Sequence, residues 1–289
     1  MSKPVKLRKG RYKVTNLSQY NRSLKARGDL TIWFTEESLE TWLAGESASK
    51  TKGGQFKYSD LAIKTVYVIR QIFNLRLRQC EGLVKSLLKL LSVDLPTPDY
   101  TTVSRRIRKL SVEFVTSRPT GNINLILDST GIKVVGEKEW INYKYNIQKQ
   151  RKIWRKLHIG VTDDGNVVVG EVNMLRDSDI ATVPALLSQV QNPVDQVVGD
   201  GAYHRKRITN DLKKFEFTKN AKFVGPPGKG IKAYGNRLKV EETFSRYKRI
   251  IGNKFKAQNI LGQINEAKIS LFILNTMKDL GMPQTVRIA

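Results

Sequence analysis

Two aspartates follow apolar runs that are typical of buried strands. Asp128 comes after Asn-Leu-Ile-Leu, and Asp200 comes after Gln-Val-Val-Gly. Burying a carboxylate is costly unless it is paired or bound to a cation, and two neighbouring carboxylates repel unless positive charge lies between them. Hard cations such as Mg²⁺ take carboxylate oxygens and need no His or Cys. Two such strands side by side would therefore form a cation site. For either Asp alone, a cap on a helix or turn is the favoured interpretation.

A third carboxylate, Glu241, lies on a helix predicted over residues 236–251. With about 100° of rotation per residue, this helix has one apolar stripe that must pack inward. The stripe consists of Val240, Phe244, Tyr247 and Ile251. Glu241 borders it, in one row with Arg237 and Lys248. The alternative is an ordinary amphipathic helix with an Arg–Glu pair at i,i+4.

The elements that would position these carboxylates are mixed strands and helices. Apolar runs predict strands over residues 122–128, 155–162, 166–174, 196–200 and 221–226. Helical periodicity predicts helices over residues 180–190, 204–215, 236–251 and 265–280. The second and third strands are joined by a predicted turn at residues 163–166, Asp-Asp-Gly-Asn. This order is typical of a layered α/β fold.

The first 120 residues favour helices. Residues 1–30 are polar and basic and are expected to form an arm, and residues 31–44 a short helix anchored by Trp33 and Trp42. A Gly/Ser/Lys linker follows at residues 45–54. Three helices are then predicted, one after Ser59 as N-cap, one over residues 79–91 and one from Asp99 or Thr101.

The third of these helices is strongly basic. Its cations are Arg105, Arg106, Arg108 and Lys109. Three short helices that end in a basic one resemble a helix-turn-helix unit, whose last helix reads DNA. A plain helical bundle with a solvated basic face is the alternative, and we favour DNA binding.

The charge of the chain points to a polyanionic partner. Its 289 residues include 51 Lys and Arg against 26 Asp and Glu, a net charge of +25, far beyond what solubility requires. Residues 1–120 carry 23 basic and 10 acidic residues, and residues 121–289 carry 28 and 16, so both halves should face the same polyanion. Nucleic acid is favoured over a membrane surface, because the charge is not confined to one amphipathic helix. A ribosome-associated protein would also be basic.

The composition excludes several kinds of site. A single cysteine, Cys80, excludes an internal disulfide framework and Cys-x-x-Cys zinc sites. Two histidines, His158 and His204, cannot form a histidine-rich metal cage, so carboxylates must hold any metal. No run approaches the ~20 apolar residues of a membrane span, and residues 1–28 lack the apolar core of a signal peptide. We therefore expect no membrane association and a cytoplasmic, nucleoid-associated protein.

Three other polar residues are predicted to have structural roles. His158 lies in a predicted strand and is interpreted as a core or surface histidine rather than a ligand. Asp177 and Asp179 precede the helix predicted over residues 180–190, and we expect them to cap its positive end.

A specific spacing links the third carboxylate to a known family. Tyr234-x2-Arg237-x3-Glu241-x6-Lys248 is the Y-R-E-K pattern of bacterial insertion-sequence transposases of the DDE class. Further segments are similar to the insertion-sequence-five family among them: DSTG at 128–131, WRKLH at 154–158, GDGAY at 199–203 and GMP at 281–283. Near the N-terminus, Tyr20-Asn21, Arg27-Gly28 and Trp33 also resemble this family. The resemblance covers about residues 18–289.

The resemblance implies a ribonuclease-H-like α/β fold, a mixed sheet flanked by helices, with Asp128, Asp200 and Glu241 as its acidic triad. It implies two Mg²⁺ ions, with Mn²⁺ as an alternative. Asp128 would bridge both ions, Asp200 would hold one and Glu241 the other. Tyr234, Arg237 and Lys248 would contact DNA near the scissile phosphate. The interval between Asp200 and Glu241 is 41 residues, which leaves little room for the insertion that some relatives carry there.

The implied function is DNA transposition. The protein would bind the ends of its insertion sequence, cut them to free 3′-OH groups and join these to target DNA. Double-stranded DNA is thus the expected partner, with a homodimer or higher assembly on it. The predicted organisation is an arm and linker over residues 1–54, a helix-turn-helix-like domain over 55–115 and the catalytic domain over 116–289. The alternatives are an inactive or repurposed DNA-binding copy and a metal-dependent nuclease or resolvase.

Overall fold

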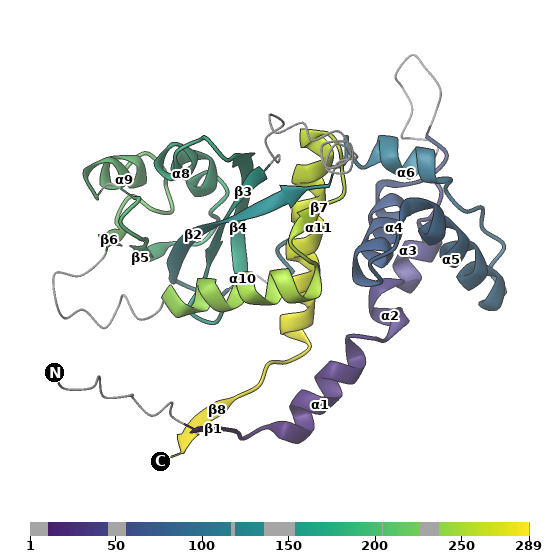
Figure 1. Ribbon diagram of the computed structural model, residues 1–289, viewed down its shortest axis with the longest axis horizontal. Helices are drawn as coiled ribbons and strands as arrows, with labels where there is room; N and C mark the ends of the chain where they lie inside the picture. Colours follow the sequence, from purple (N-terminus) through teal and green to yellow (C-terminus); the bar gives the residue numbers. More distant parts are fainter. Residues whose placement is uncertain are drawn as a thin grey trace, which may run out of the picture.

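A mixed β-sheet forms one part of the molecule and a layer of helices the other (Figure 1). The computed structural model describes residues 11–45, 56–116, 119–135, 154–203, 205–225 and 237–288. The sheet has the order β4-β3-β2-β5-β6, and β7 pairs with the far end of β2. Its strands are β2 (Ile123–Val134), β3 (Trp154–Val161), β4 (Val167–Met174), β5 (Val194–Val198), β6 (Lys222–Val224) and β7 (Lys254–Phe255).

The sheet is antiparallel at one edge and parallel at the other. β2, β3 and β4 form an antiparallel meander, whereas β5 runs parallel to β2 and β6 runs parallel to β5. This mixed sheet flanked by helices confirms the predicted ribonuclease-H-like fold. The strand predicted to end at Asp128 in fact continues to Val134, because residues 128–133 stay paired with β3. Asp128 therefore lies inside a strand and not at its end.

Helices cover both faces of the sheet (Figure 1). On one face lie α8 (Asp179–Leu187) and α9 (Arg205–Leu212), which pack on Leu125 and Leu127 of β2. On the other lie α10 (Leu238–Ile250) and α11 (Ile260–Asp279), which pack on Ile126. Because side chains alternate along a strand, Asp128 has the same orientation as Ile126 and is directed to the side of α10. None of the helices in the described ranges is long and apolar enough to span a membrane.

The helical layer is built on α4 (Asp60–Ile72), α5 (Leu77–Leu90) and α6 (Tyr100–Arg106). The predicted N-cap Ser59 is confirmed, since it accepts a hydrogen bond from the amide of Ala62 at 3.0 Å. The third helix is capped by Asp99, which accepts from the amides of Thr101 and Thr102 at 2.9 Å. Such caps satisfy amides that would otherwise lack a partner at a helix start.

Two short helices replace the single one expected over residues 31–44. They are α2 (Leu30–Trp33) and α3 (Glu36–Glu40), and the break falls at Thr35, whose side chain caps α3. Trp33 and Trp42 are buried in the same core as α4, α5 and α6. The domain boundary between residues 54 and 55 stays a prediction, since this core extends across it.

The long helix α11 links the two parts of the molecule. Its residues Leu271 and Leu274 belong to the core under the sheet, while Ile269, Ile273 and Met277 belong to the core of the helical layer. One rigid element thus holds the helical layer against the sheet.

The segment expected as an N-terminal arm has regular structure from residue 11. Its elements are β1 (Arg11–Val14) and α1 (Leu17–Ala26), and β1 pairs antiparallel with the last strand, β8 (Thr285–Ile288). The prediction of an arm did not include this regular structure, because a strand partner more than 250 residues away leaves no local signal. Residues 1–10 lie outside the described residues.

Candidate active site

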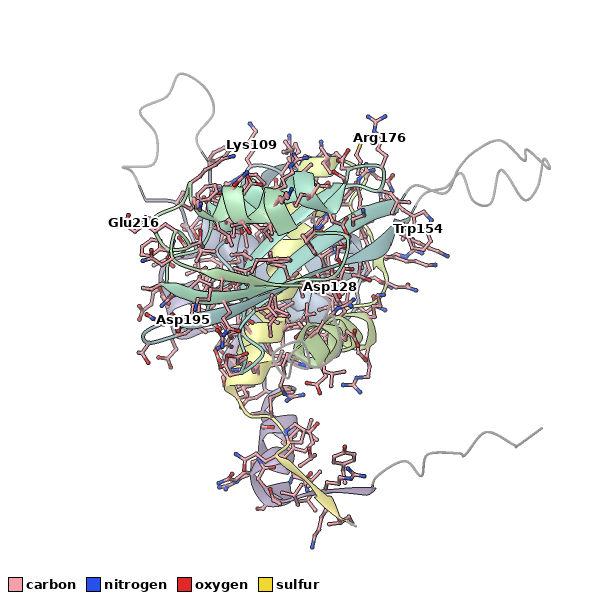
Figure 2. All side chains as sticks on the ribbon, turned by 90° about the vertical axis from the view of Figure 1, so that its left-hand side faces the viewer. Lys109, Asp128, Trp154, Arg176, Asp195 and Glu216 are labelled. Carbon is pink, nitrogen blue, oxygen red and sulfur yellow. The ribbon has the colours of Figure 1, made fainter. Side chains whose placement is uncertain are left out.

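The register between β2 and β5 brings the two aspartates together. Ile126 pairs with Val198 in the parallel ladder, so Asp128 and Asp200 each lie two residues beyond a paired position on neighbouring strands. The prediction that two adjacent strands would place these carboxylates at one site is thereby matched by the structure. Figure 2 shows Asp128 between Trp154, at the start of β3, and Asp195, near the start of β5.

Helix α10 adds the third carboxylate. The apolar stripe predicted for this helix is buried, with Val240, Phe244 and Tyr247 all in the core beneath the sheet. That packing fixes the rotation of α10 and leaves the Glu241 side chain 54% exposed beside the stripe. Residue 236, where the helix was predicted to begin, lies outside the described residues, and α10 begins at Leu238.

One guanidinium contacts all three carboxylates. Arg237 Nη2 lies 3.4 Å from Asp128 Oδ2 and 3.9 Å from Asp200 Oδ2, and its Nε lies 3.9 Å from Glu241 Oε1. Only the first contact is within hydrogen-bond distance. Arg237 thus balances part of the negative charge that the three acids bring to this corner, and each contact is long compared with an optimal ion pair.

Asp128 is largely buried within the acidic corner. Its side chain is 13% exposed, and burial raises the pKa of its carboxyl above the ordinary value. The backbone amide of Ser129, which donates to Asp128 Oδ1 at 2.8 Å, and the charge of Arg237 both oppose this rise in pKa. The site therefore holds a desolvated carboxylate whose charge is favoured by a nearby cation.

A second polar cluster lies directly beside Asp128. Ser129 Oγ donates to Asp179 Oδ2 at 3.1 Å, and Lys156 Nζ pairs with Asp179 Oδ1 at 2.6 Å. The expected capping by Asp179 is corrected: it sits in the first turn of α8, but its carboxylate is bound by Ser129 and Lys156. Asp177 accepts from the amide of Met174 instead of a helix amide.

Sequence reasoning gave no role to the Lys156–Asp179 pair, although two of the motifs that resemble the transposase family contain Ser129 and Lys156. The pair joins the first turn of α8 to strand β3, and Ser129, the residue after Asp128, is bonded to it. These contacts therefore fix the backbone of β2 next to Asp128. His158, on the next inward position of β3, is fully buried, which agrees with the prediction of a core histidine.

Comparison with known families shows which family the chain belongs to. Two family models, both described as Transposase DDE domain, match residues 25–137 and residues 120–276. The second match alone covers more than half of the chain and includes Asp128, Asp200 and Glu241. This chain belongs to the DDE transposase family. The narrower assignment to the insertion-sequence-five family stays a prediction.

The acidic corner of this transposase has the chemistry of a divalent-cation site. All three side chains offer hard oxygen ligands, and the corner already attracts a cationic group, Arg237. Among the residues that the structure describes, no three acidic, histidine or cysteine side chains are close enough together to hold one metal ion. The donor types fit Mg²⁺ or Mn²⁺, whereas in this arrangement the guanidinium of Arg237 lies between the carboxylates and provides the positive charge.

The predicted DNA-binding residues of the transposase fall into two groups. Arg105, Arg108 and Lys109 are exposed at the end of α6. Arg106 is buried: its Nη1 donates to the carbonyl of Tyr58 at 2.9 Å, and its Nη2 pairs with Asp60. The structure thus gives Arg106 a role in holding α6 against α4, in contrast to its three neighbours.

Near the acidic corner, Lys248 is exposed on α10, two turns after Glu241. It lies in the same row of α10 as Glu241, beside the buried stripe. Tyr234 and His204 lie outside the described residues.

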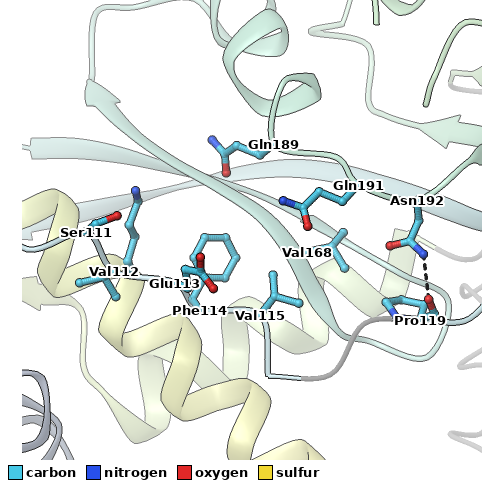
Figure 3. A pocket seen from close by; sticks show the side chains of 11 residues that line it. Ser111, Val112, Glu113, Phe114, Val115, Pro119, Val168, Gln189, Gln191 and Asn192 are labelled. Atoms are coloured by element: carbon cyan, nitrogen blue, oxygen red, sulfur yellow. Dashed lines mark hydrogen bonds between the residues drawn. The ribbon is translucent and has the colours of Figure 1, made fainter. Parts of the chain in front are cut away.

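Two cavities lie away from the acidic corner. One, of about 640 Å³, adjoins the exposed cations of α6 and is lined by Phe56, Tyr58, Arg105 and Lys109 among others. The other, of about 270 Å³, lies between residues 111–115 and the end of α8, with Gln189 and Gln191 across from Phe114 (Figure 3). No residue of the triad lines either cavity.

Proposed function

We propose that this transposase binds the ends of its insertion sequence, hydrolyses a phosphodiester bond at each end and joins the freed 3′-OH to target DNA. The observation that supports this most directly is the convergence of Asp128, Asp200 and Glu241 on the guanidinium of Arg237. A basic chain of net charge +25 that brings three carboxylates together at one corner has the charge pattern of a metal-dependent enzyme acting on DNA.

The proposed chemistry consists of two displacements at phosphorus. In the first, a water oxygen forms a bond to phosphorus while the bond to the 3′-oxygen breaks, which leaves a 3′-OH at the end of the element. In the second, this 3′-oxygen forms a bond to a target phosphorus and displaces the 3′-oxygen of the target strand. Neither step requires a covalent bond to the protein, so no Ser or Tyr nucleophile is needed.

Asp128, Asp200 and Glu241 would hold the metal, for which we propose two Mg²⁺ ions, with Mn²⁺ able to replace them. Bound divalent cations supply Lewis-acid activation of the attacking and leaving oxygens. The buried position of Asp128, fixed by the Ser129 amide and by the Lys156–Asp179 pair, keeps its carboxylate in one orientation. Glu241 is exposed enough to adjust when a phosphate enters the site.

Arg237 is suited to bind that phosphate. A guanidinium pairs with phosphate oxygens through two parallel hydrogen bonds, and the guanidinium of Arg237 already lies beside all three carboxylates. Lys248 continues the same face of α10 and would bind the neighbouring backbone, as would Tyr234. Further away, Arg105, Arg108 and Lys109 on α6 would contact the end of the element, and two copies of the chain would hold two ends together.

The test compares the native protein with the Asp128→Asn variant on a labelled duplex that carries the end of its element, with Mg²⁺. We expect the native protein to cut and join the DNA and the variant to bind it without chemistry, with a rate loss of roughly a thousand-fold or more for about 4 kcal/mol of lost transition-state stabilisation. Asp195→Asn is the matched control, because Asp195 is exposed near the opposite end of β5.

The outcomes separate the possible functions. Binding by both proteins without chemistry would favour an inactive or repurposed DNA-binding copy. Cleavage without joining would favour a nuclease. Equal activity of the native protein and Asp128→Asn would exclude Asp128 from the site.

A further inference from the structure

The two ends of the described chain form one small unit, which we call the terminal module and define as residues 11–27 and 280–288. Its strands β1 and β8 form a two-stranded ribbon, and α1 lies beside the turn that leads into β8. Several hydrogen bonds fix this arrangement: Asn16 Nδ2 donates to Met282 O at 3.0 Å, Arg27 Nη2 to Gly281 O at 2.8 Å, and the amide of Gln284 to Asn16 Oδ1 at 2.8 Å. These hydrogen bonds hold the two ends of the described chain together as one structural unit.

The terminal module stands away from the rest of the molecule. Figures 1 and 2 both show the ribbon and α1 projecting from the end of α11, and within the described ranges the strands of the ribbon pair only with each other. Its apolar side chains remain in solvent: Tyr12 is 66% exposed, Val286 48% and Ile288 41%. Exposed apolar groups on both faces of one small element are available for contact with a partner.

The charge of the terminal module has one sign only. Residues 11–27 and 280–288 include six basic residues and no acidic one. Among them, Lys13, Arg22, Lys25 and Arg287 are exposed. In the ribbon, Tyr12 is opposite Arg287 and Lys13 is opposite Val286, so each face combines a cation with an apolar side chain.

We propose that the terminal module binds duplex DNA, with the β1–β8 ribbon in the major groove and α1 beside the phosphate backbone. Two strands about 4.8 Å apart form a ribbon narrow enough for the groove, which is about 12 Å wide and is known to admit such ribbons. Lys13 and Arg287 would neutralise phosphates, while the apolar side chain of the face turned into the groove, Tyr12 on one face or Val286 on the other, would contact base edges and thymine methyl groups. This inference rests on the proposed function, in which DNA is the substrate.

A basic groove connects the terminal module to the catalytic helix. This cavity, of about 430 Å³, is lined by Met282, Pro283 and Thr285 at the base of the ribbon and by Lys239, Glu242 and Arg249 of α10, among others. Lys239 and Arg249 are exposed. A duplex held by the ribbon could therefore continue along α10, the helix that carries Glu241.

A second copy of the chain is a less suitable occupant. Two terminal modules in contact would bring like charges together without an acidic residue to pair with, and such an arrangement is unfavourable within a Debye length of about 8 Å at physiological salt. DNA releases counterions when it meets the same cations, which favours binding. The positive charge of the terminal module thus favours DNA over a second copy of the chain as its partner.

The experiment measures the affinity of the full chain for a labelled duplex across a range of salt. The double variant Lys13→Gln with Arg287→Gln should weaken binding at least about tenfold near 0.1 M salt and reduce the slope of log K against log salt by about 2, because two phosphate contacts are lost. The control, Lys206→Gln with Lys213→Gln, removes the same charge at α9, on the opposite side of the molecule (Figure 1), and should leave both values unchanged.

Each outcome has a defined meaning. Equal melting temperatures of the two double variants would show that the ribbon variant is folded. If that variant binds DNA like the α9 control while the native protein still cuts its ends, the inference is overturned and the proposed function stands. If it keeps its DNA affinity but no longer self-associates in sedimentation, the ribbon joins two copies and the inference is also wrong. A native protein whose DNA binding is independent of salt would instead contradict the proposed function.

Discussion

Arg106 and Arg237 have the same side chain, and both lie against acids, yet the protein holds them in different ways. Arg106 is 7% exposed, donates to the Tyr58 carbonyl at 2.9 Å and pairs with Asp60. The side chain of Arg237 is 27% exposed, and its guanidinium nitrogens lie 3.4 to 3.9 Å from one oxygen of each of three carboxylates. The contacts of Arg106 with Tyr58 and Asp60 are short, whereas those of Arg237 with the three carboxylates are long.

This difference separates a structural cation from one that can change partners. Removing Arg106 from its site would leave the Tyr58 carbonyl without its hydrogen bond, which carries a desolvation cost. Moving Arg237 towards a phosphate would exchange long contacts for short, bidentate ones. A basic residue in a DNA-binding protein is therefore better judged by the quality of its contacts than by its charge.

The largest expected effect is on Arg237. Its replacement in Arg237→Gln should slow cleavage about 100-fold, for about 3 kcal/mol, because a donor to the reacting phosphate is lost. Without divalent cations, the free energy of unfolding should also fall by about 1 kcal/mol, because three carboxylates lose their shared cation. Cleavage rates with saturating DNA and Mg²⁺, and denaturation in the presence of a chelator, measure the two effects.

Arg207→Gln, on the surface of α9, is the control for charge alone. If Arg237→Gln cleaves at the native rate, Arg237 does not contact the reacting phosphate. If it unfolds at the same denaturant concentration as the control in the chelator, the three carboxylates do not depend on its charge. Either result would remove the contrast with Arg106.

Arg106 should show the opposite behaviour. Arg106→Met keeps much of the side chain's length and apolar packing but loses its hydrogen bond to Tyr58 and its pairing with Asp60, so we expect the free energy of unfolding to fall by about 2 kcal/mol. Urea denaturation measures this loss. The exposed neighbour in Arg105→Met should change stability by less than about 0.5 kcal/mol. Equal stability of the two variants would show that the burial of Arg106 contributes nothing.

Much of the site follows from local patterns in the sequence. The runs before Asp128 and Asp200 indicated neighbouring strands, and the stripe of Val240, Phe244 and Tyr247 fixed the face of α10 beside which Glu241 lies. These inferences succeed because strand and helix periods determine which way a side chain points. The burial of Arg106 could have been inferred in the same way, since it lies three residues after Val103 and four before Leu110, both of which are buried.

Other features depend on pairings that a local pattern does not contain. The β1–β8 ribbon joins residues at the two ends of the chain, and the continuation of β2 beyond Asp128 depends on β3 as its partner. The role of Asp179 likewise depends on Lys156 from another strand. For these residues, the prediction used only neighbours in the sequence and gave an arm or a helix cap. The contacts with β8 and with Lys156 come from distant parts of the chain and could not be inferred in this way.

His158 extends the comparison of Arg106 with Arg237, because among the described residues its side chain has neither short nor long polar contacts at its ring nitrogens. It is fully buried, and neither ring nitrogen has a hydrogen-bond partner within the described part of the chain. Burial lowers the pKa of His158 to about 4. The charged groups around it are Lys156 on its own strand, Asp177 and Asp179 at the start of α8, and Glu171 opposite it on β4.

The protein should therefore lose stability in mild acid. Between about pH 6.5 and pH 4, the unfolded chain binds a proton at His158 that the folded chain does not, so the free energy of unfolding falls as the pH falls. From about pH 7 to about pH 5.5 this amounts to about 1 kcal/mol. Denaturation at both pH values measures the loss, and His158→Leu should reduce it by that amount. An equal loss in His158→Leu would mean that His158 keeps its ordinary pKa in the folded protein and is hydrated, unlike a residue buried without partners.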